Sequence, residues 1–155
     1  MPEYSIDTSS IVYGWREQYP PAHFPTLWQR MEEAIGEGLV VAPRDVLLEL
    51  KTIEPDAYEW ARKQDRLSIE LDEPIQQATK HILCEYRELV KHKANRTRAD
   101  AFVIAVAQVH RCAVVTNEKR TYSLDRPHIP DVCAELRIRC IDLLGLIRDR
   151  DWVIG

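Results

Sequence analysis

The chain alternates between short runs of apolar residues and longer stretches in which apolar residues recur every three or four positions. The short runs, such as 39–42 and 113–116, have the length and composition of buried strands. Within residues 24–38 the apolar residues fall on one face of a helix, and Gly36 and Gly38 end that pattern. Strands are predicted at residues 4–6, 39–42, 68–71, 113–116 and 138–142. Helices are predicted at residues 24–38, 44–53, 56–67, 73–93, 98–112, 129–137 and 143–152.

The alternation of strands and helices is typical of an α/β fold with a mostly parallel sheet. We therefore predict a three-layer sandwich in which helices cover both faces of a mostly parallel central sheet. The length of 155 residues suits one ordinary domain, and no repeat, low-complexity tract or linker divides it. We expect a single domain over residues 1–155.

Composition and charge narrow the possible environments and partners. The net charge of −4 attracts no nucleic acid to the molecule as a whole, so any such contact requires a local basic patch. The four cysteines form no CxxC pair, which fits reduced cytosolic thiols. No signal peptide pattern opens the chain, and no apolar stretch approaches the ~20 residues that span a bilayer. We expect a cytoplasmic protein without a membrane segment.

The strand predicted at residues 4–6 ends on an acid, Asp7, which is followed by Thr8 and Ser9. Aspartate is a favoured N-cap, so Asp7 could simply begin the next helix. Alternatively, Asp7 could stand at the carboxyl end of a parallel strand, where open α/β sheets place their binding sites.

Two further acids lie on the core-facing sides of predicted helices. Glu49 shares a helical face with Val46 and Ile53, where a glutamate is rarely buried without a partner. Asp100 begins the apolar stripe of the helix at 98–112. Each has a structural alternative: Glu49 could extend to water, and Asp100 could favour the helix dipole in a first turn that Thr97 would cap.

A fourth acid repeats the pattern of Asp7. The strand at 113–116 is followed by Asn117 and Glu118, and Glu118 alone would be a surface loop acid. Together, the four acids can converge at the carboxyl edge of one sheet. Clustered carboxylates repel each other unless a cation holds them, and oxygen ligands select Mg²⁺ or Mn²⁺.

Four short motifs in this chain resemble those of the PIN-domain family. "SIDTSS" resembles its first acidic motif, "LLEL" the second, "ADAFVIAVA" the third and "VVTNE" the fourth. The order and separations fit the family over nearly the whole chain. "FPTLW" and "IPDVC" also resemble a PIN-like subgroup related to the VapC-type toxins of prokaryotic toxin–antitoxin modules.

The resemblance implies a Mg²⁺- or Mn²⁺-dependent endoribonuclease, the toxin of such a module, which hydrolyses RNA phosphodiester bonds. It also implies a cognate antitoxin protein and a homodimer. Catalytic and metal-binding roles carry over to Asp7, Glu49, Asp100 and Glu118. Supporting polar roles carry over to Thr8, Ser9, Thr116 and Asn117. The family usually has aspartate where this chain has Glu118, whose longer side chain could reach the metal through water or not bind it at all.

The most basic stretch of the chain, residues 87–98, leads directly to Asp100. Its cations include Lys91, Lys93, Arg96 and Arg98. We interpret it as a rim that contacts RNA phosphates, although a solvated loop is the structural alternative. Tyr13 and Trp15 could stack on bases, but packing against the sheet is the favoured interpretation.

Other functions fit the sequence less well. Asp7 could be a phosphorylated aspartate in a phosphoryl-transfer enzyme, but a haloacid-dehalogenase-like enzyme would have a second aspartate at the position of Ser9. A response-regulator receiver would carry its phosphorylated aspartate after a later strand. No GxGxxG or GxSxG motif is present. The remaining alternative is a non-catalytic PIN-like module that binds a partner or RNA.

Overall fold

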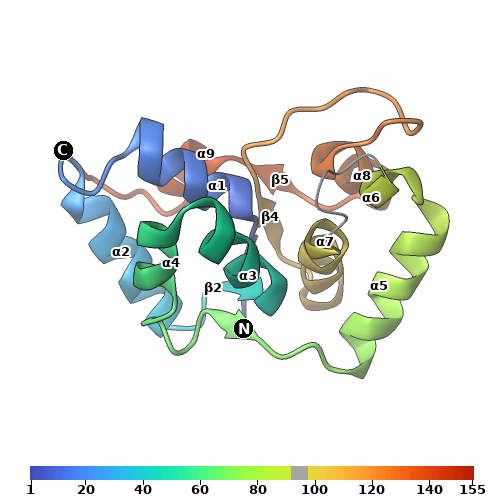
Figure 1. The fold of residues 1–155 in the computed structure, drawn as a ribbon, viewed down its shortest axis with the longest axis horizontal. Coiled ribbons are helices and arrows are strands. Elements are labelled where there is room, and N and C mark those ends of the chain that lie inside the picture. The colour runs from blue at the N-terminus through green and yellow to red at the C-terminus, as the bar shows by residue number, and fades with distance from the viewer. Residues whose placement is uncertain (92–97) are drawn as a thin grey trace.

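The described part of the chain, residues 1–91 and 98–155 of a computed structural model, contains a five-stranded sheet of order β3–β2–β1–β4–β5 (Figure 1). Every strand pair in it is parallel, and Ile6 of β1 lies opposite Val115 of β4. The strands are β1 (Tyr4–Ile6), β2 (Val40–Pro43), β3 (Ser68–Ile69), β4 (Ala113–Val115) and β5 (Cys140–Ile141).

Helices cover both faces of this sheet. They are α1 (Thr8–Tyr13), the π-helical turn η1 (Gly14–Gln18), α2 (Pro25–Gly36), α3 (Arg44–Ile53), α4 (Pro55–Ala61), α5 (Glu73–Glu85), α6 (Glu88–Lys91), α7 (Ala99–His110), α8 (Ile129–Leu136) and α9 (Leu143–Asp149). Figure 1 places α2 and α9 on one side of the sheet and α5, α7 and α8 on the other. The predicted three-layer α/β sandwich is therefore confirmed.

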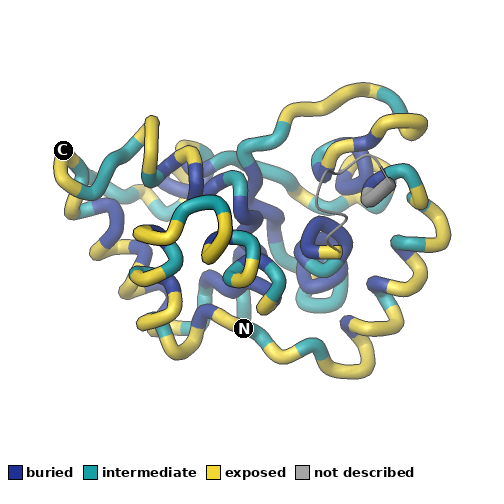
Figure 2. The backbone as a smooth tube through the Cα atoms, viewed as in Figure 1, coloured by how far each residue is buried: buried dark blue, intermediate teal, exposed yellow. Residues whose placement is uncertain are grey.

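The innermost helix is α7, which contacts β1, β2 and β4 and is itself covered by α5 and α8. Because other elements enclose it, α7 buries apolar residues around most of its circumference, and Figure 2 shows it as a dark core. Ala101 and Ala105 are small enough to let the neighbouring elements approach closely. This explains the alanine-rich sequence of the helix.

Several predicted element boundaries differ from the observed ones. The single helix predicted at 73–93 is wrong, because Tyr86 leaves the helical conformation and divides it into α5 and α6. The bend keeps both pieces packed on α7. The sequence pattern also did not predict α1 and η1, whose apolar residues Ile11 and Val12 are too few to define a stripe.

Three tryptophans pack together at the end of the molecule that carries α2 and α4. The ring centroids of Trp15 and Trp28 lie 4.9 Å apart, and that of Trp60 lies 5.7 Å from Trp15 and 5.1 Å from Trp28. The indole nitrogen of Trp28 donates to the carbonyl of Tyr19. Trp15 is therefore a packing residue, but the rings it contacts belong to α2 and α4 and not to the sheet.

None of the helices in the described ranges is both long enough and apolar enough to cross a lipid bilayer.

Replacing Trp28 by alanine is expected to lower the free energy of unfolding by about 3–5 kcal/mol, because a buried ring would leave a cavity. Urea denaturation followed by circular dichroism measures this loss. The exposed residue Val153 provides the control, since Val153→Ala should change stability by less than about 0.5 kcal/mol. Equal stability of the two variants would contradict the packing described for the cluster.

Candidate active site

Two strand ends bring the first and the last of the four acids together. Asp7 follows β1, and Thr116 and Glu118 follow β4, which is the neighbour of β1 in the sheet. Asp7 occupies the N-cap position of α1 in an extended conformation, but its side chain makes no capping hydrogen bond. Of the two interpretations of Asp7, the structure therefore supports a carboxylate directed to the edge of the sheet.

A small network of hydroxyl groups orients the carboxylate of Asp7, a residue that is only 2% exposed. Ser9 Oγ donates to Asp7 Oδ2 at 2.6 Å, and Thr116 Oγ1 donates to the same oxygen at 2.9 Å. The backbone N–H of Asn117 donates to Ser9 Oγ at 2.9 Å, and that of Glu118 donates to Thr116 Oγ1 at 3.1 Å. The loop after β4 is thereby tied to the Asp7 side chain.

A second hydroxyl group positions Glu49 on α3. Thr8 Oγ1 in the first turn of α1 donates to Glu49 Oε1 at 2.6 Å. The bond links the two helices that follow β1 and β2, which pack against each other. Glu49 therefore lies at the same edge of the sheet as Asp7, as predicted.

Asp100 is the second residue of α7 and is 5% exposed. Its position in the first turn suits the partial positive charge of a helix N-terminus. The N-cap is Arg98, and the predicted capping residue, Thr97, lies outside the described residues. The same helix that fills the core thus directs its acidic first turn to the edge of the sheet.

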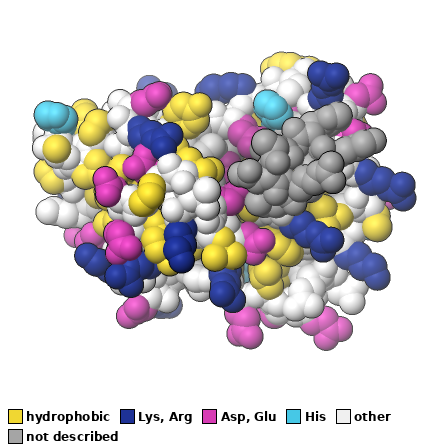
Figure 3. Space-filling view, in the orientation of Figure 1, with side chains coloured by type: hydrophobic (Ala, Val, Ile, Leu, Met, Phe, Trp, Pro, Cys, Tyr) yellow, Lys and Arg dark blue, Asp and Glu magenta, His cyan; other side chains and the backbone are white. Residues whose placement is uncertain are grey.

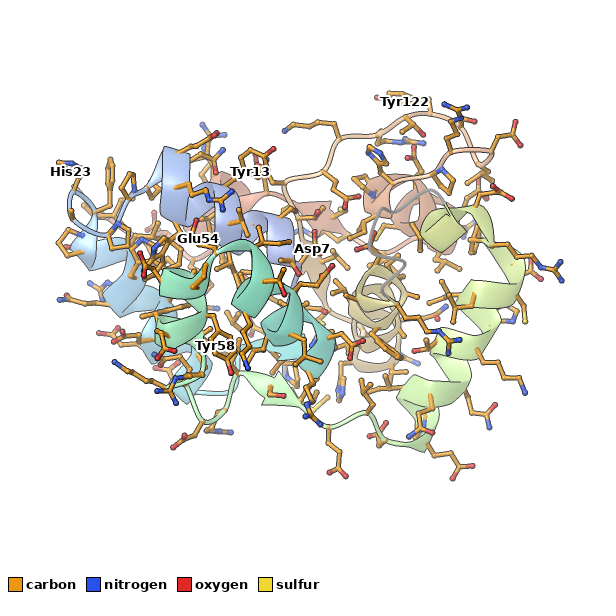
Figure 4. All side chains as sticks on the ribbon, in the orientation of Figure 1. Asp7, Tyr13, His23, Glu54, Tyr58 and Tyr122 are labelled. Atoms are coloured by element: carbon orange, nitrogen blue, oxygen red, sulfur yellow. The ribbon has the colours of Figure 1, made fainter. Side chains whose placement is uncertain are left out.

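The four predicted acids line one pocket with a volume of 340 Å³. Acidic side chains gather near the middle of the face drawn in Figure 3, and the Asp7 label marks this region in Figure 4. Thr8 and Ser9 also line the pocket. The structure therefore brings together acids from β1, α3, α7 and the loop after β4.

The chemistry of these donors fits a hard divalent cation, because all four carboxylates and the neighbouring hydroxyls offer oxygen. Within residues 1–91 and 98–155, however, no three His, Cys, Asp or Glu side chains are close enough to hold one metal ion. For three of these acids to bind the same metal ion, some of the carboxylates would therefore have to rotate from the positions described above.

Glu118 lies between two parts of the surface. It lines the acidic pocket and also a neighbouring pocket of 220 Å³ that includes Lys119 and Arg120. Its Oε1 accepts a hydrogen bond from the backbone N–H of Ile129, the first residue of α8, at 3.1 Å. The longer side chain, compared with aspartate, allows Glu118 to reach α8 while it borders the acidic pocket.

A family model described as "Domain of unknown function (DUF4411)" matches residues 4–154. The chain belongs to the DUF4411 family. The match includes all four acids and every strand of the described sheet. A search of curated proteins finds none that matches this DUF4411 chain.

Two charged residues that the sequence pattern did not indicate, Arg16 and Glu17, also line the acidic pocket of this DUF4411 domain. Both belong to η1, the turn that the hydrophobic pattern did not predict. Arg16 forms an ion pair with Glu54 and donates to the carbonyl of Ile53, which fixes η1 against the end of α3. Tyr13, which precedes η1, is exposed and also lines the pocket, so the expectation that it packs against the sheet is wrong.

Cys133 and Cys140 are not among the residues that line the acidic pocket. A hydrogen bond with Cys140 raises the pKa of Cys133, and burial and the negative charges of Asp7 and Glu118 raise it further. Cys133 therefore remains a neutral thiol at physiological pH, whereas the same hydrogen bond lowers the pKa of Cys140. Among the metal-ligating residue types, the lining of the acidic pocket offers only carboxylates and hydroxyls.

The structure describes the predicted basic stretch only in part. Lys93 and Arg96 lie outside the described residues. Lys91 ends α6, and Arg98 is an exposed residue at the N-cap of α7, one residue before Ala99. The phosphate-binding role of this stretch stays a prediction.

A buried acid that the sequence analysis did not single out, Asp131, organises the loop between β4 and α8. It is 2% exposed and accepts backbone N–H groups from Thr121, Tyr122 and His128 at 2.8–3.1 Å. Burial by itself raises the pKa of Asp131, but these hydrogen bonds outweigh it and lower the pKa to about 2. The only sequence signal was its place in "IPDVC", as the third residue of α8.

We expect Mg²⁺ or Mn²⁺ to raise the melting temperature of this DUF4411 domain. A cation at 100 times its dissociation constant adds ~2.7 kcal/mol if it binds only the folded state. Asp7→Asn should remove this gain, whereas Asp56→Asn should retain it, because Asp56 is exposed and outside the pocket. Thermal denaturation with and without the cation makes the comparison, and an equal response of wild type and Asp7→Asn would refute the assignment.

Asp131→Asn should lower the free energy of unfolding at pH 7 by about 1–3 kcal/mol, because hydrogen bonds to an ionised acceptor are lost. Since the folded-state pKa is depressed to about 2, this contribution is present above the unfolded pKa of about 3.9. It is lost as the pH falls through about 2. Urea denaturation between pH 7 and pH 2 should show the difference from wild type shrinking. Asp125→Asn, an exposed change in the same loop, should match wild type throughout.

Proposed function

We propose that this DUF4411 domain is a metal-dependent endoribonuclease with a PIN-like fold. The observation that supports it is the meeting of four acids from four separate elements in one pocket at the carboxyl edge of a parallel sheet. Two of them, Asp7 and Asp100, are almost completely buried. Ionised carboxylates in such positions carry a large desolvation cost, which a bound cation would offset.

Each residue has a role in this proposal. Asp7 and Asp100 would hold the cation, and Ser9 and Thr116 orient Asp7 through their hydroxyl groups. Glu49 would complete the ligand set or accept the proton of the attacking water, and Thr8 holds its side chain in place. A bound Mg²⁺ or Mn²⁺ supplies a Lewis acid for the phosphate and lowers the pKa of a water molecule.

Glu118 has a more peripheral role in the same reaction. Its hydrogen bond to Ile129 holds one carboxylate oxygen against α8, so we assign it to the rim of the pocket. From there it would contact the cation through water or accept a proton. A cation held by these carboxylates would act on the phosphate, which every nucleotide carries, so in this proposal the choice of RNA site falls to the surface around the pocket.

The biological context follows from the family resemblance and is part of the proposal. The protein would act as the toxin of a prokaryotic toxin–antitoxin module in the cytoplasm, with a cognate antitoxin and a second copy of itself as partners. All four cysteines lie in the described ranges and are unpaired, which agrees with a reducing compartment. Co-expression and co-purification with the protein encoded by the neighbouring reading frame tests whether that protein is the antitoxin.

A non-catalytic PIN-like module that binds RNA or a protein is the second candidate. The observation that favours it is the spacing of the acids, since no three of them in the described part of the chain share liganding distance. Metal binding without RNA cleavage would identify this alternative.

Asp100→Asn is expected to abolish RNA cleavage while leaving RNA binding intact or tighter, because it removes a proposed metal ligand and a negative charge near phosphate. Asp56→Asn is the matched control, since Asp56 is also an acid in the first turn of a helix but is exposed and outside the pocket. Cleavage and filter binding are measured on the same RNA with Mg²⁺, Mn²⁺ or EDTA. If Asp100→Asn retains full activity, Asp100 serves only to stabilise the start of α7, and the nuclease proposal is contradicted.

A further inference from the structure

The loop of residues 119–128 stands beside the acidic pocket on the connection from β4 to α8. It begins directly after Glu118, which lines both the acidic pocket and the neighbouring pocket that includes Lys119 and Arg120. In Figure 1 this connection forms the orange trace along the upper edge of the molecule. A strand of nucleic acid in the acidic pocket could therefore continue along the 119–128 loop.

The 119–128 loop is held in one conformation although it contains no helix or strand. Asp131 accepts the N–H groups of Thr121, Tyr122 and His128 and also the hydroxyl group of Thr121 at 3.0 Å. The ring nitrogen Nδ1 of His128 lies 2.9 Å from the carbonyl oxygen of Lys119, which connects the two ends of the loop. A ligand that binds there would meet a surface that is already ordered.

Tyr122 is exposed to solvent although its backbone adopts an unfavourable conformation. Its side chain is 80% exposed, and Figure 4 shows it at the outer edge of the molecule. Its backbone has a φ of 60°, a left-handed conformation that a bulky residue rarely adopts and that glycine or asparagine would fill more easily. The hydrogen bond from Tyr122 N to Asp131 Oδ1 at 2.8 Å maintains this conformation. A large exposed aromatic residue at such a position points to a role in binding.

One cation lies against this ring. The Arg120 guanidinium lies 4.4 Å from the centroid of the Tyr122 ring, and its Nε lies 3.6 Å from Asp131 Oδ1. Lys119 and Arg126 of the same loop are also exposed. The 119–128 loop contains three cationic residues and one acid, Asp125, whereas the whole chain has a net charge of −4. It is therefore a local basic patch of the kind that nucleic-acid binding requires in an acidic protein.

An exposed aromatic ring beside cations matches single-stranded nucleic acid. Unpaired bases stack on aromatic side chains, and arginine and lysine contact the backbone phosphates. A duplex offers the same phosphates but keeps its bases stacked internally, so it would make no use of Tyr122. An acidic protein segment would pair with the cations but has no comparable need for the ring.

We propose that the 119–128 loop binds single-stranded RNA, with one unpaired base stacked on Tyr122 and the adjacent phosphates on Lys119 and Arg120. The choice of RNA rests on the proposed endoribonuclease function. The loop would then select unpaired RNA and lead it past Glu118 to the acidic pocket.

The central test compares Tyr122→Gly and Tyr122→Phe with wild type. Fluorescence anisotropy measures binding of a labelled single-stranded RNA, and of the same RNA annealed to its complement, in EDTA to prevent cleavage. Tyr122→Gly should weaken single-strand binding about tenfold, which lies within the usual range for the loss of one stacked base. Tyr122→Phe should bind like wild type, and duplex binding should be equal in all three proteins.

Stability separates binding from folding in this comparison. Glycine adopts a φ of 60° without strain, so Tyr122→Gly should melt at or above the wild-type temperature while it loses RNA affinity. Leu124→Ala, another exposed apolar residue in the loop, is the control and should retain affinity. Lys119→Ala with Arg120→Ala should reduce the dependence of binding on salt by about one unit of slope per lost phosphate contact.

The possible results distinguish this inference from the proposed function. If Tyr122→Gly binds single-stranded RNA as wild type does, the inference is overturned, even if wild type cleaves RNA. If Tyr122→Gly loses affinity but wild type cleaves no RNA in Mg²⁺ or Mn²⁺, the inference stands and the nuclease proposal fails. If the substitution leaves RNA binding intact but prevents binding of a co-expressed protein partner, the loop is a protein contact and the RNA assignment is wrong.

Discussion

The carboxylate of Asp7 is the group around which the candidate site is built. It is buried at the end of the first strand, so its charge must be compensated by hydrogen bonds or by a cation. The hydroxyl groups of Ser9 and Thr116 supply two of these hydrogen bonds and connect β1 to the segment after β4. Glu118 is thereby brought to the same pocket as Asp7.

A second buried carboxylate has a comparable effect on the neighbouring loop. Asp131 gathers the N–H groups of Thr121, Tyr122 and His128, so a segment without regular structure becomes an ordered surface. Asp7 accepts hydrogen bonds from side-chain hydroxyls and borders the acidic pocket. Asp131 accepts hydrogen bonds from backbone N–H groups and is not among the residues that line the acidic pocket or its 220 Å³ neighbour. The arrangement around Asp7 is suited to binding a cation, and the arrangement around Asp131 is suited to holding the 119–128 loop in place.

These two arrangements place opposite charges next to each other. The acidic pocket and the basic 119–128 loop meet at Glu118 and Lys119. In our proposal the cations hold the RNA backbone, while the acids hold the metal that acts on it. The adjacency also explains how a chain of net charge −4 could bind a polyanion.

The sequence by itself determined the α/β class and the edge of the sheet at which the four acids lie. Hydrophobic periodicity shows which face of a helix is buried, and parallel strands place their carboxyl ends at one edge. Only the tertiary structure decided which side chains meet, because Thr116 and Asp7 are 109 residues apart and their contact leaves no local pattern. The same holds for Thr8 with Glu49 and for the loop gathered by Asp131, since these hydrogen bonds depend on how separate elements pack.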